Sequence, residues 1–423
     1  MKIQLWKWKS TKLTRIGAKF LYVSGILVSG TCAILFGFLD QCPPGDTFVA
    51  MSFIVRSVEA LGVSAFSTAS FAIVSNEFPN HISSVFATLE TCIGIGLMTG
   101  PTIGGALYEV GGFGLPFWAI GAVICISGLM VFTCLPPPED NTLKRKGSIF
   151  CLLKSLLVWV TILSLLAGAI GISFMDPTLS DHLDQFGIST LVVGLFFVIA
   201  PGLHALMAPV WGYFSDTKDI QSPLLIIGNV VGAIGYLFIG PTPLLPFLPS
   251  ELWTVTVGLV LFGFTVGCSI VPTMKLFVIG ARELGLPDSL NTYGLVSGLF
   301  NSMFCLGAFI GPTIGGALVE QIGFYYGSTL ISGFYLFVMI ITAIFFGLRR
   351  LRKQRLENRE TDLTGHVESS LHRTLGQQDN SVSLTDRQAD ERGHQADERR
   401  PLLSNSTHIK SFETSFSSTS YSR

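Results

Sequence analysis

The chain contains the stretch Gly100-Pro101-Thr102-Ile103-Gly104-Gly105-Ala106-Leu107 twice, since it returns 211 residues later as Gly311-Pro312-Thr313-Ile314-Gly315-Gly316-Ala317-Leu318. A Glu follows each copy at the same distance, Glu109 and Glu320. Eight identical residues in a row indicate an internal duplication; the alternative is a small-residue packing motif that arose twice. In either case the glycines let helices approach closely, and the proline bends its helix.

Both copies lie within long apolar segments. Of the 423 residues, 49% are hydrophobic and 13% are charged, whereas soluble domains carry roughly 25% charged residues. Crossing the hydrocarbon core takes about 20 mainly apolar residues, and backbone in lipid must satisfy its own hydrogen bonds, so each crossing segment is expected to be a helix. We expect ten such spans, at approximately 17–39, 47–74, 84–108, 114–135, 152–175, 188–214, 223–241, 251–273, 292–319 and 324–347.

The duplication divides these spans into two related but unequal halves. It aligns the third span with the ninth and the fourth with the tenth, whereas the spans at 152–175 and 188–214 have no counterpart. The sequence therefore predicts an all-α polytopic membrane protein, and repeated halves are typical of transporters with a central site. The expected parts are a basic N-terminus at 1–16, four spans at 17–135, a loop at 136–151, six spans at 152–348 and a disordered tail at 349–423.

Basic residues predict the orientation of the chain, because loops rich in Lys and Arg stay in the cytosol. The outer loops near 40–47, 108–114, 176–188, 240–251 and 319–324 contain no Lys or Arg. Both ends of the chain and the inner loops do contain them, so both termini are expected in the cytosol. The tail is rich in Ser, Thr, Glu, Asp, Arg and Gln, a composition typical of disorder.

Several function classes find no support in the sequence. The net charge is −1 and no basic stripe indicates nucleic-acid binding. The eight Cys lie mostly within apolar runs, without CxxC or Cys/His spacing, so neither a disulfide framework nor a metal site is expected. No nucleophile–base set or phosphate loop is evident, and we expect no catalytic residue, cofactor or enzymatic activity.

The repeated stretch belongs to a longer pattern, Gly-x-x-x-Gly-Pro-x-x-Gly-Gly. This pattern resembles the antiporter motif in the fifth helix of the major facilitator superfamily, a family of twelve-helix transporters. Arg56-Ser57-Val58-Glu59-Ala60-Leu61-Gly62 resembles the fourth-helix Arg motif of that family, and Gly212-Tyr213-Phe214-Ser215-Asp216 resembles its Gly-x-x-x-Asp loop. The antiporter-motif residues are Gly96, Gly100, Pro101, Gly104 and Gly105 in the first copy and Gly307, Gly311, Pro312, Gly315 and Gly316 in the second.

Within the superfamily, residues 174–179 and 304–316 look most like the vesicular amine transporters. The segments Leu89-Glu90-Thr91 and 293–300 are similar to the polyamine-transporting branch. This resemblance implies exchange of lumenal protons for cytosolic amines.

The chain also departs from this family in three places. Residues 16–20 look like the end of the first Gly-x-x-x-Asp loop, so we expect the first two helices to be absent, together with an acidic residue implicated in amine binding. Asn301 and Ile279 stand where the monoamine carriers have acids, which speaks against a monoamine substrate.

Glu90 and Asp176 are the acids that we expect to bind substrate or protons. Glu90 lies inside a span, where a charge is costly and tends to be functional. A carboxylate there could hold either a cation or a proton, as exchange requires. Asp176 lies next to Pro177 at the expected lumenal end of its helix. The alternatives are a neutral acid that links helices for Glu90 and a solvated helix end for Asp176.

Three other polar residues each allow two interpretations. Arg56 and Glu59 are three residues apart and share a helix face, so they could couple protons or only pair with each other. Asn301 could hydrogen-bond substrate or link two helices.

For four further residues we favour a structural role. His204 could relay protons, but a packed neutral side chain is the favoured interpretation. Lys275 is expected to anchor its helix by reaching the headgroups. Phe174 and Tyr293 could contact an amine through their rings, although packing is the favoured interpretation for both.

The tail contains Glu398-Arg399-Arg400-Pro401-Leu402-Leu403, in which Glu398, Leu402 and Leu403 resemble an acidic dileucine sorting signal read by clathrin adaptors. The alternative is an ordinary stretch of disordered tail. The leading hypothesis is a proton-coupled antiporter of organic cations, polyamines foremost, in intracellular vesicle membranes. The alternatives are a truncated isoform or incomplete gene model that does not transport, and a multidrug exporter of the same superfamily.

Overall fold

The computed structural model describes residues 17–135, 149–241 and 248–397, and the regular elements of these ranges are helices. Ten of the described helices are long and apolar enough to cross a membrane. The prediction of an all-α, multi-span protein is therefore confirmed. The long helices are α2 (Ala18–Gly37), α3 (Asp46–Glu77), α4 (Ile82–Gly111), α5 (Gly114–Cys134), α7 (Leu156–Asp184), α8 (Thr190–Thr217), α9 (Gln221–Ile239), α10 (Leu252–Glu283), α11 (Leu290–Ile322) and α12 (Phe324–Asp397).

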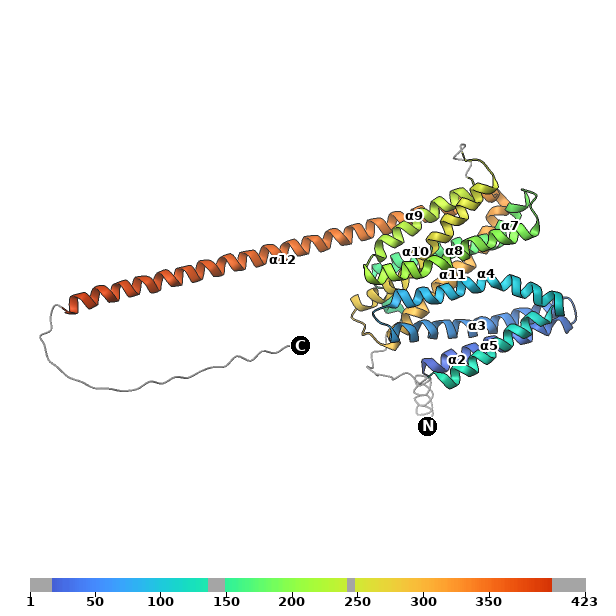
Figure 1. Cartoon of the computed structure of the whole chain (residues 1–423), viewed down its shortest axis with the longest axis horizontal. Coiled ribbons are helices and arrows are strands. Elements are labelled where there is room, and N and C mark those ends of the chain that lie inside the picture. Colours follow the sequence, from blue (N-terminus) through green and yellow to red (C-terminus); the bar gives the residue numbers. More distant parts are fainter. Residues whose placement is uncertain (1–16, 136–148, 242–247, 398–423) are drawn as a thin grey trace. The chain divides into compact units, whose positions relative to one another are not determined.

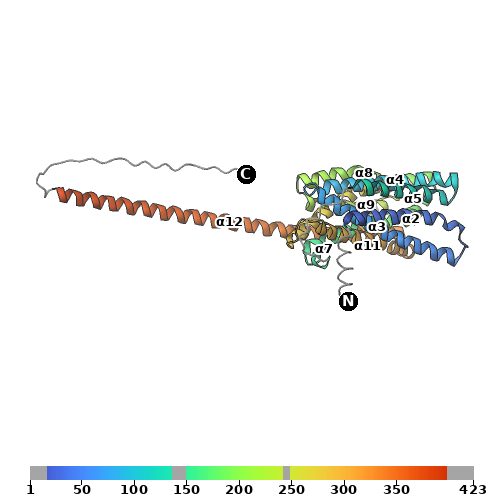
Figure 2. The same cartoon turned by 90° about the horizontal axis from the view of Figure 1, so that it is seen from below.

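Two short elements, η1 (Leu39–Gln41) and α6 (Ile149–Leu152), join the long helices. Figures 1 and 2 show the helices of the bundle running alongside one another. The helices α2 to α5 lie in the range expected for the first half. The helices α7 to α11 and the start of α12 lie in the range expected for the second half. The loop at 136–148, the basic N-terminus at 1–16 and the dileucine pattern at 398–403 lie outside the described residues.

Prolines lie inside several helices instead of ending them. The span expected to end at residue 175 continues through Pro177 to Asp184, and α8 passes through Pro201 and Pro209. A proline in a helix leaves the carbonyl four residues earlier without its usual donor, and neighbouring helices can cover that carbonyl. Asp176 consequently lies inside α7, two turns before its end, and the expectation that it sits at a helix end is wrong.

In the first half, α2 packs against both α3 and α5. The contact with α3 is close, because a Cβ placed on Gly25 would lie 2.7 Å from the carbonyl oxygen of Gly62. The amide-bearing backbones of two helices can approach this closely only where both residues lack side chains.

The largest core lies mainly among α7, α9, α10, α11 and α12, and it extends to α3 and α4 of the first half. Several polar groups inside this core are hydrogen-bonded: the Asn229 amide donates to Ser164 Oγ at 3.2 Å and to the carbonyl of Leu225 at 2.7 Å. The Tyr236 hydroxyl donates to the carbonyl of Gly171, and Ser328 Oγ donates to the carbonyl of Tyr236 at 2.6 Å. These bonds tie α9 to α7 and α12, and each stabilises the core because a buried unpaired polar group costs about 1–3 kcal/mol.

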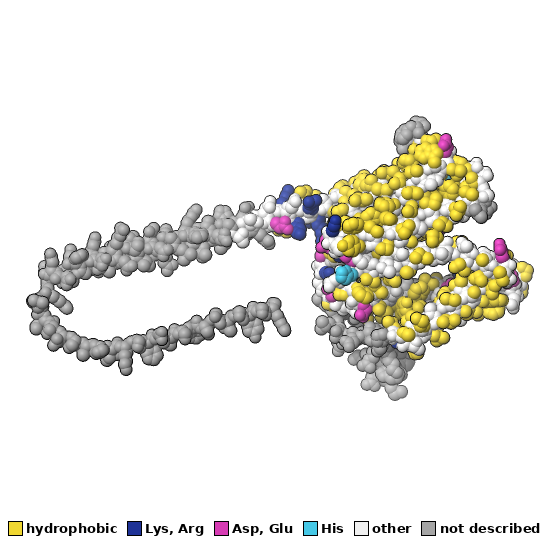
Figure 3. Space-filling view, viewed as in Figure 1, with side chains coloured by type: hydrophobic (Ala, Val, Ile, Leu, Met, Phe, Trp, Pro, Cys, Tyr) yellow, Lys and Arg dark blue, Asp and Glu magenta, His cyan; other side chains and the backbone are white. Residues whose placement is uncertain are grey.

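Hydrophobic side chains cover the flank of the bundle, while charged side chains gather at its ends (Figure 3). Such a surface suits a hydrocarbon surrounding, in which exposed apolar side chains carry no penalty.

Residues 349–423 form a separate unit. We expected disorder from residue 349, but α12 continues to Asp397. No Pro occurs between residues 349 and 397, and Leu, Arg, Glu and Gln, which favour helix, are frequent there. Lys353 and Glu357 add an ion pair of 3.7 Å one turn apart.

The two copies of the glycine motif have different surroundings. In the second copy, a Cβ on Gly311 would lie 2.9 Å from the carbonyl oxygen of Ile170 on α7, and one on Gly307 would lie 2.6 Å from Ala169 Cβ. In the first copy, a Cβ on Gly96, Gly100, Gly104 or Gly105 would meet no atom of the described chain within 4 Å. The same sequence therefore holds two helices together in one half and leaves an open face on α4 in the other.

This difference gives a paired prediction. Gly311→Val should destabilise the bundle by about 1–3 kcal/mol, because the new side chain has no space against α7. Gly100→Val, the matched position 211 residues earlier, should leave stability nearly unchanged. Thermal unfolding of the two purified variants checks this, and equal losses for both would contradict the packing described here.

Candidate functional site

The helix turns define two ends of the bundle. One end carries the turns at 78–81, 218–220 and 284–289, and we call it the inner end because the sequence predicts that it faces the cytosol. The other carries the turns at 112–113 and 185–189, and we call it the outer end. The two halves meet where α4 packs along α8 and α10, and where α3 packs along α11.

A cavity of about 520 Å³ lies at this seam, between α3, α4 and α11. It brings together four residues that the sequence analysis named as candidates, two from α3, one from α4 and one from α11. The four are Arg56, Glu59, Glu90 and Asn301. Arg56 and Glu59 lie nearer the outer end, because α3 runs inward from Asp46.

Glu90 is almost fully buried, with 6% of its surface exposed. Its Oε2 lies 3.6 Å from Nε2 of His204 on α8, so the acid of the first half faces a histidine of the second. The imidazole is buried as well, and its Nδ1 has no hydrogen-bond partner in the described part of the chain. This contact could not be anticipated from the sequence, because 114 residues separate the two side chains and no motif contains both.

The next residue, Thr91, also joins the halves. Its hydroxyl donates to the carbonyl of Ala205 at 3.1 Å, which is the carbonyl that Pro209 leaves without a helical donor. One turn further along α4, a Cβ on Gly94 would lie 2.9 Å from Ala205 Cβ. Glu90, Thr91 and Gly94 thus form one contact surface against α8.

Arg56 and Glu59 form an ion pair of 2.9 Å, as their spacing predicts. The Arg56 guanidinium also lies 4.0 Å from the centre of the Phe36 ring on α2. Because the two charges neutralise each other, Glu90 is the acid of this cavity that lacks a permanently charged partner among the described residues.

Three phenyl rings close the cavity towards the inner end. Phe71 of α3, Phe86 of α4 and Phe300 of α11 contact one another edge to face, with ring centres 5.0 to 5.7 Å apart. All three are buried. Beside them, the Asn301 amide donates to Thr68 Oγ1 at 3.2 Å, so Asn301 links α11 to α3 as one of its two interpretations expected.

Below the rings, Asp216 joins the halves at the inner end. Its carboxylate accepts hydrogen bonds from the backbone N–H groups of Ser83 and Ser84, at 3.2 and 2.7 Å, in the first turn of α4. An anion there also complements the positive end of the helix dipole. Gly212 makes this possible, because a Cβ at that position would lie 2.6 Å from Ala87 Cβ.

Lys275 completes this contact. Its Nζ lies 3.4 Å from Asp216 and 3.0 Å from Asp219, so the interpretation of Lys275 as a headgroup anchor is wrong. The hydrogen bond from Lys275 lowers the pKa of the exposed Asp219 carboxyl below 3.8. A lowered pKa means that ionised Asp219 contributes stability above its normal titration range, and that this contribution is lost as the pH falls below it.

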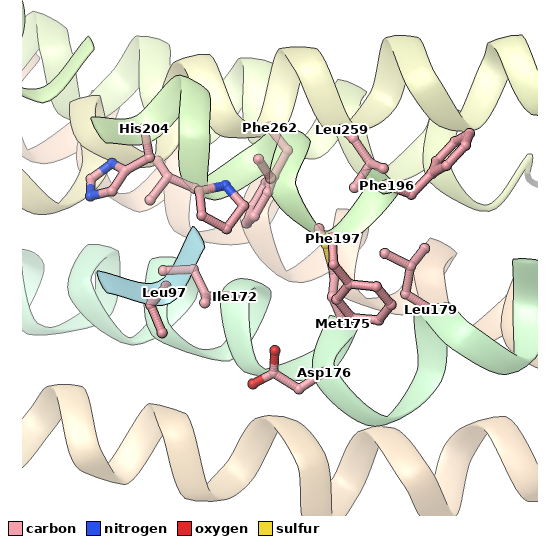
Figure 4. Close-up of a pocket in the computed structure, with 13 residues that line it drawn as sticks. Leu97, Ile172, Met175, Asp176, Leu179, Phe196, Phe197, His204, Leu259 and Phe262 are labelled. Carbon is pink, nitrogen blue, oxygen red and sulfur yellow. The ribbon is translucent and has the colours of Figure 1, made fainter. Parts of the chain in front are cut away.

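Asp176 lies in a different place. It lines a smaller cavity of about 80 Å³ between α7, α8 and α10, whose walls are mainly apolar. Figure 4 shows Asp176 and His204 on different walls of this cavity, Asp176 from α7 and His204 from α8. The structure therefore does not bring Asp176 and Glu90 together, although His204 borders the small cavity and contacts Glu90 on its other side.

The two aromatic candidates are packing residues. Phe174 is fully buried against Tyr236 and Phe324, with ring centres about 6 Å away. Tyr293 is buried too, and neither side chain lines the two cavities described.

Comparison with known sequences shows to which protein family this chain belongs. The sequence model of the major facilitator superfamily matches residues 11–285. The chain belongs to the major facilitator superfamily. Its members are transporters, so the cavity between the two halves is where a major facilitator protein is expected to hold its cargo.

Relatives and solved structures agree with this assignment. The human MFS-type transporter SLC18B1 is 36% identical over 361 residues, which cover 85% of this chain and 78% of the relative. The human synaptic vesicular amine transporter is 23% identical over 332 residues, 75% of this chain and 59% of the relative.

Two solved structures share the fold of this major facilitator chain. The human organic anion transporter MFSD10 (TETRAN) has a TM-score of 0.58 at 17% identity, covering 77% of this chain and 81% of that one. FucP in its outward conformation has the same TM-score at 12% identity, covering 78% and 83%.

The Asp216 contact predicts how this major facilitator bundle responds to substitution. Asp216→Ala should lower the free energy of unfolding by about 1–3 kcal/mol, since the first N–H groups of α4 lose their acceptor in a buried place. Asp219→Ala, which removes the exposed partner of Lys275, should change it by about 0–1 kcal/mol. Thermal unfolding of both variants at neutral pH separates them, and an equal effect would argue against Asp216 as the link between the halves.

Proposed function

We propose that this chain is a proton-coupled antiporter that moves organic cations, polyamines foremost, into intracellular vesicles. The observation that carries the proposal is the buried carboxylate of Glu90 in the cavity between the halves. A cation is the cargo that such a carboxylate attracts, because a buried charge is stable only when it is paired.

The rest of the cavity supports this choice of cargo. Arg56 and Glu59 neutralise each other, so the cavity has no surplus positive charge that would favour an anion. Phe71, Phe300 and Phe304 line its inner part, and aromatic faces attract ammonium groups. A volume of about 520 Å³ falls within the usual range for small-molecule sites.

Exchange would follow from competition for one carboxylate. An amine and a proton cannot both neutralise Glu90, so a rise in proton concentration on one side expels the amine there. The aromatic rings and the Asp216 contact close the inner end in this conformation. On the predicted orientation, Glu90 then faces the lumen of the vesicle, where protons are abundant, and rocking of the halves returns it to the cytosol.

The name of one more distant relative supports a cationic cargo. One relative is described as a synaptic vesicular amine transporter, and Glu90-Thr91 occupies the seam against α8 in this chain. Asp176, exposed at the smaller cavity, is a second acid that could hold a cation or a proton on the lumenal side.

Uptake of labelled spermidine tests this proposal. Vesicles that contain the full chain should accumulate spermidine when their interior is acidic, and a protonophore should abolish the accumulation. Glu90→Gln should lose nearly all uptake because it removes the buried carboxylate that the amine would neutralise in the larger cavity. Glu109→Gln, an exposed Glu on the same helix, should transport normally.

Failure of the correctly localised wild-type chain to take up spermidine would contradict the proposal. It would favour the alternative that this form does not transport. If Glu90→Gln still takes up spermidine, the chain is an antiporter but Glu90 is not its cation-binding residue.

The vesicle location has its own test. The pattern of Glu398, Leu402 and Leu403 lies outside the described residues, and sorting by clathrin adaptors stays a prediction. Replacing both leucines with Ala should move a tagged chain from intracellular vesicles to the cell surface. An unchanged location, or a wild-type chain already at the surface, would instead favour a multidrug exporter.

A further inference from the structure

His204 is the side chain that the proposed exchange has not yet used. It lies on α8, in the second half, and faces the carboxylate of Glu90 in the first half at 3.6 Å. This separation lies within ion-pair range but exceeds the about 3.2 Å limit of a hydrogen bond. The pair is therefore weak while the imidazole is neutral, and it becomes a strong attraction once the imidazole is protonated.

The position of the pair is fixed on both sides. Thr91 holds α4 to the Ala205 carbonyl, next to His204 in the sequence. On the far side of the ring, Gly267 of α10 leaves room for Nδ1, since a Cβ there would lie 3.5 Å from that nitrogen. Nδ1 is buried without a partner among the described residues, so a proton on the ring has no acceptor other than Glu90 close by.

The charged groups around the pair are few. Glu90 of α4 faces His204 directly, and Asp176 of α7 lines another wall of the small cavity. The wall that α10 contributes consists of Leu259, Phe262, Val266 and Gly267, which carry no charge. On the cavity side of Glu90, the charges are those of the paired Arg56 and Glu59.

We propose that His204 is the proton carrier of the exchange. In this mechanism the proton binds to an imidazole nitrogen of His204, and the Glu90 carboxylate stays ionised. The imidazolium then replaces the amine as the counter-ion of Glu90, and the amine is released into the cavity. At Glu90, one imidazolium charge takes the place of one ammonium group, and the other ammonium groups of a polyamine leave together with it.

Chemistry favours His204 over Glu90 for this step. Imidazole is the side chain that proteins most often use to take up and release protons near physiological pH. Because the two members of the pair belong to opposite halves, the ion pair also draws α4 and α8 together. Proton binding would thereby favour one arrangement of the halves, and amine binding would release it.

This inference rests on the proposed function, and the pH dependence of binding separates the two. Spermidine binding to the purified full chain is measured between about pH 5.5 and about pH 8. Wild-type affinity should fall about tenfold per pH unit once the imidazole is protonated. His204→Gln should bind spermidine at every pH with less than about a twofold change, and it should still exchange amine for amine while losing uptake driven by a pH gradient.

Two further variants make the result decisive. His204→Lys places a fixed charge beside Glu90 and should bind spermidine weakly at every pH. His182→Gln removes another buried histidine, which stacks on Phe324 away from both cavities, and it should keep the wild-type pH profile.

The possible outcomes divide cleanly. If His204→Gln keeps the full pH dependence, the proton binds elsewhere, and the inference is overturned while the antiporter proposal stands. If the wild-type chain does not bind spermidine at any pH, both proposals fall. A monodisperse elution profile and an unchanged melting temperature confirm that each variant is folded.

Discussion

The close approach of α4 to α8 is the constraint on which the rest of the structure depends. Gly94 removes the bulk that would separate the two helices, and Thr91 satisfies a carbonyl that Pro209 leaves free. Only at this spacing can Glu90 and His204 face each other from opposite halves. The aromatic contact of Phe71, Phe86 and Phe300 and the Asp216 contact then close the same seam further inward.

Much of the fold could be predicted from the sequence because lipid permits few solutions. Apolar runs of sufficient length must be helices, and ten were found where ten were expected. Beyond residue 349 the polar composition predicts disorder, whereas the structure describes α12 as far as Asp397, because helix-favouring residues are frequent there. Helix boundaries at Pro177 were also missed, because only neighbouring helices decide whether a proline ends a helix or lies within one.

The site was predicted only in part. A buried acid such as Glu90 stands out in an apolar run, and the spacing of Arg56 and Glu59 placed them on one face. The partners of Glu90 and Asp216 did not stand out, because both contacts cross between halves that are more than a hundred residues apart. Such pairings follow from the packing of whole helices, for which local patterns carry no information.

The bond between Thr91 and the Ala205 carbonyl has a consequence for the working cycle. When the halves separate, the Ala205 carbonyl loses its hydrogen bond from the Thr91 hydroxyl. No helical N–H can replace it, because residue 209 is a proline. A bare carbonyl in an apolar seam costs about 1–3 kcal/mol, and a water molecule is the remaining donor able to relieve it. Opening of the seam and entry of water beside Glu90 and His204 are therefore expected to occur together.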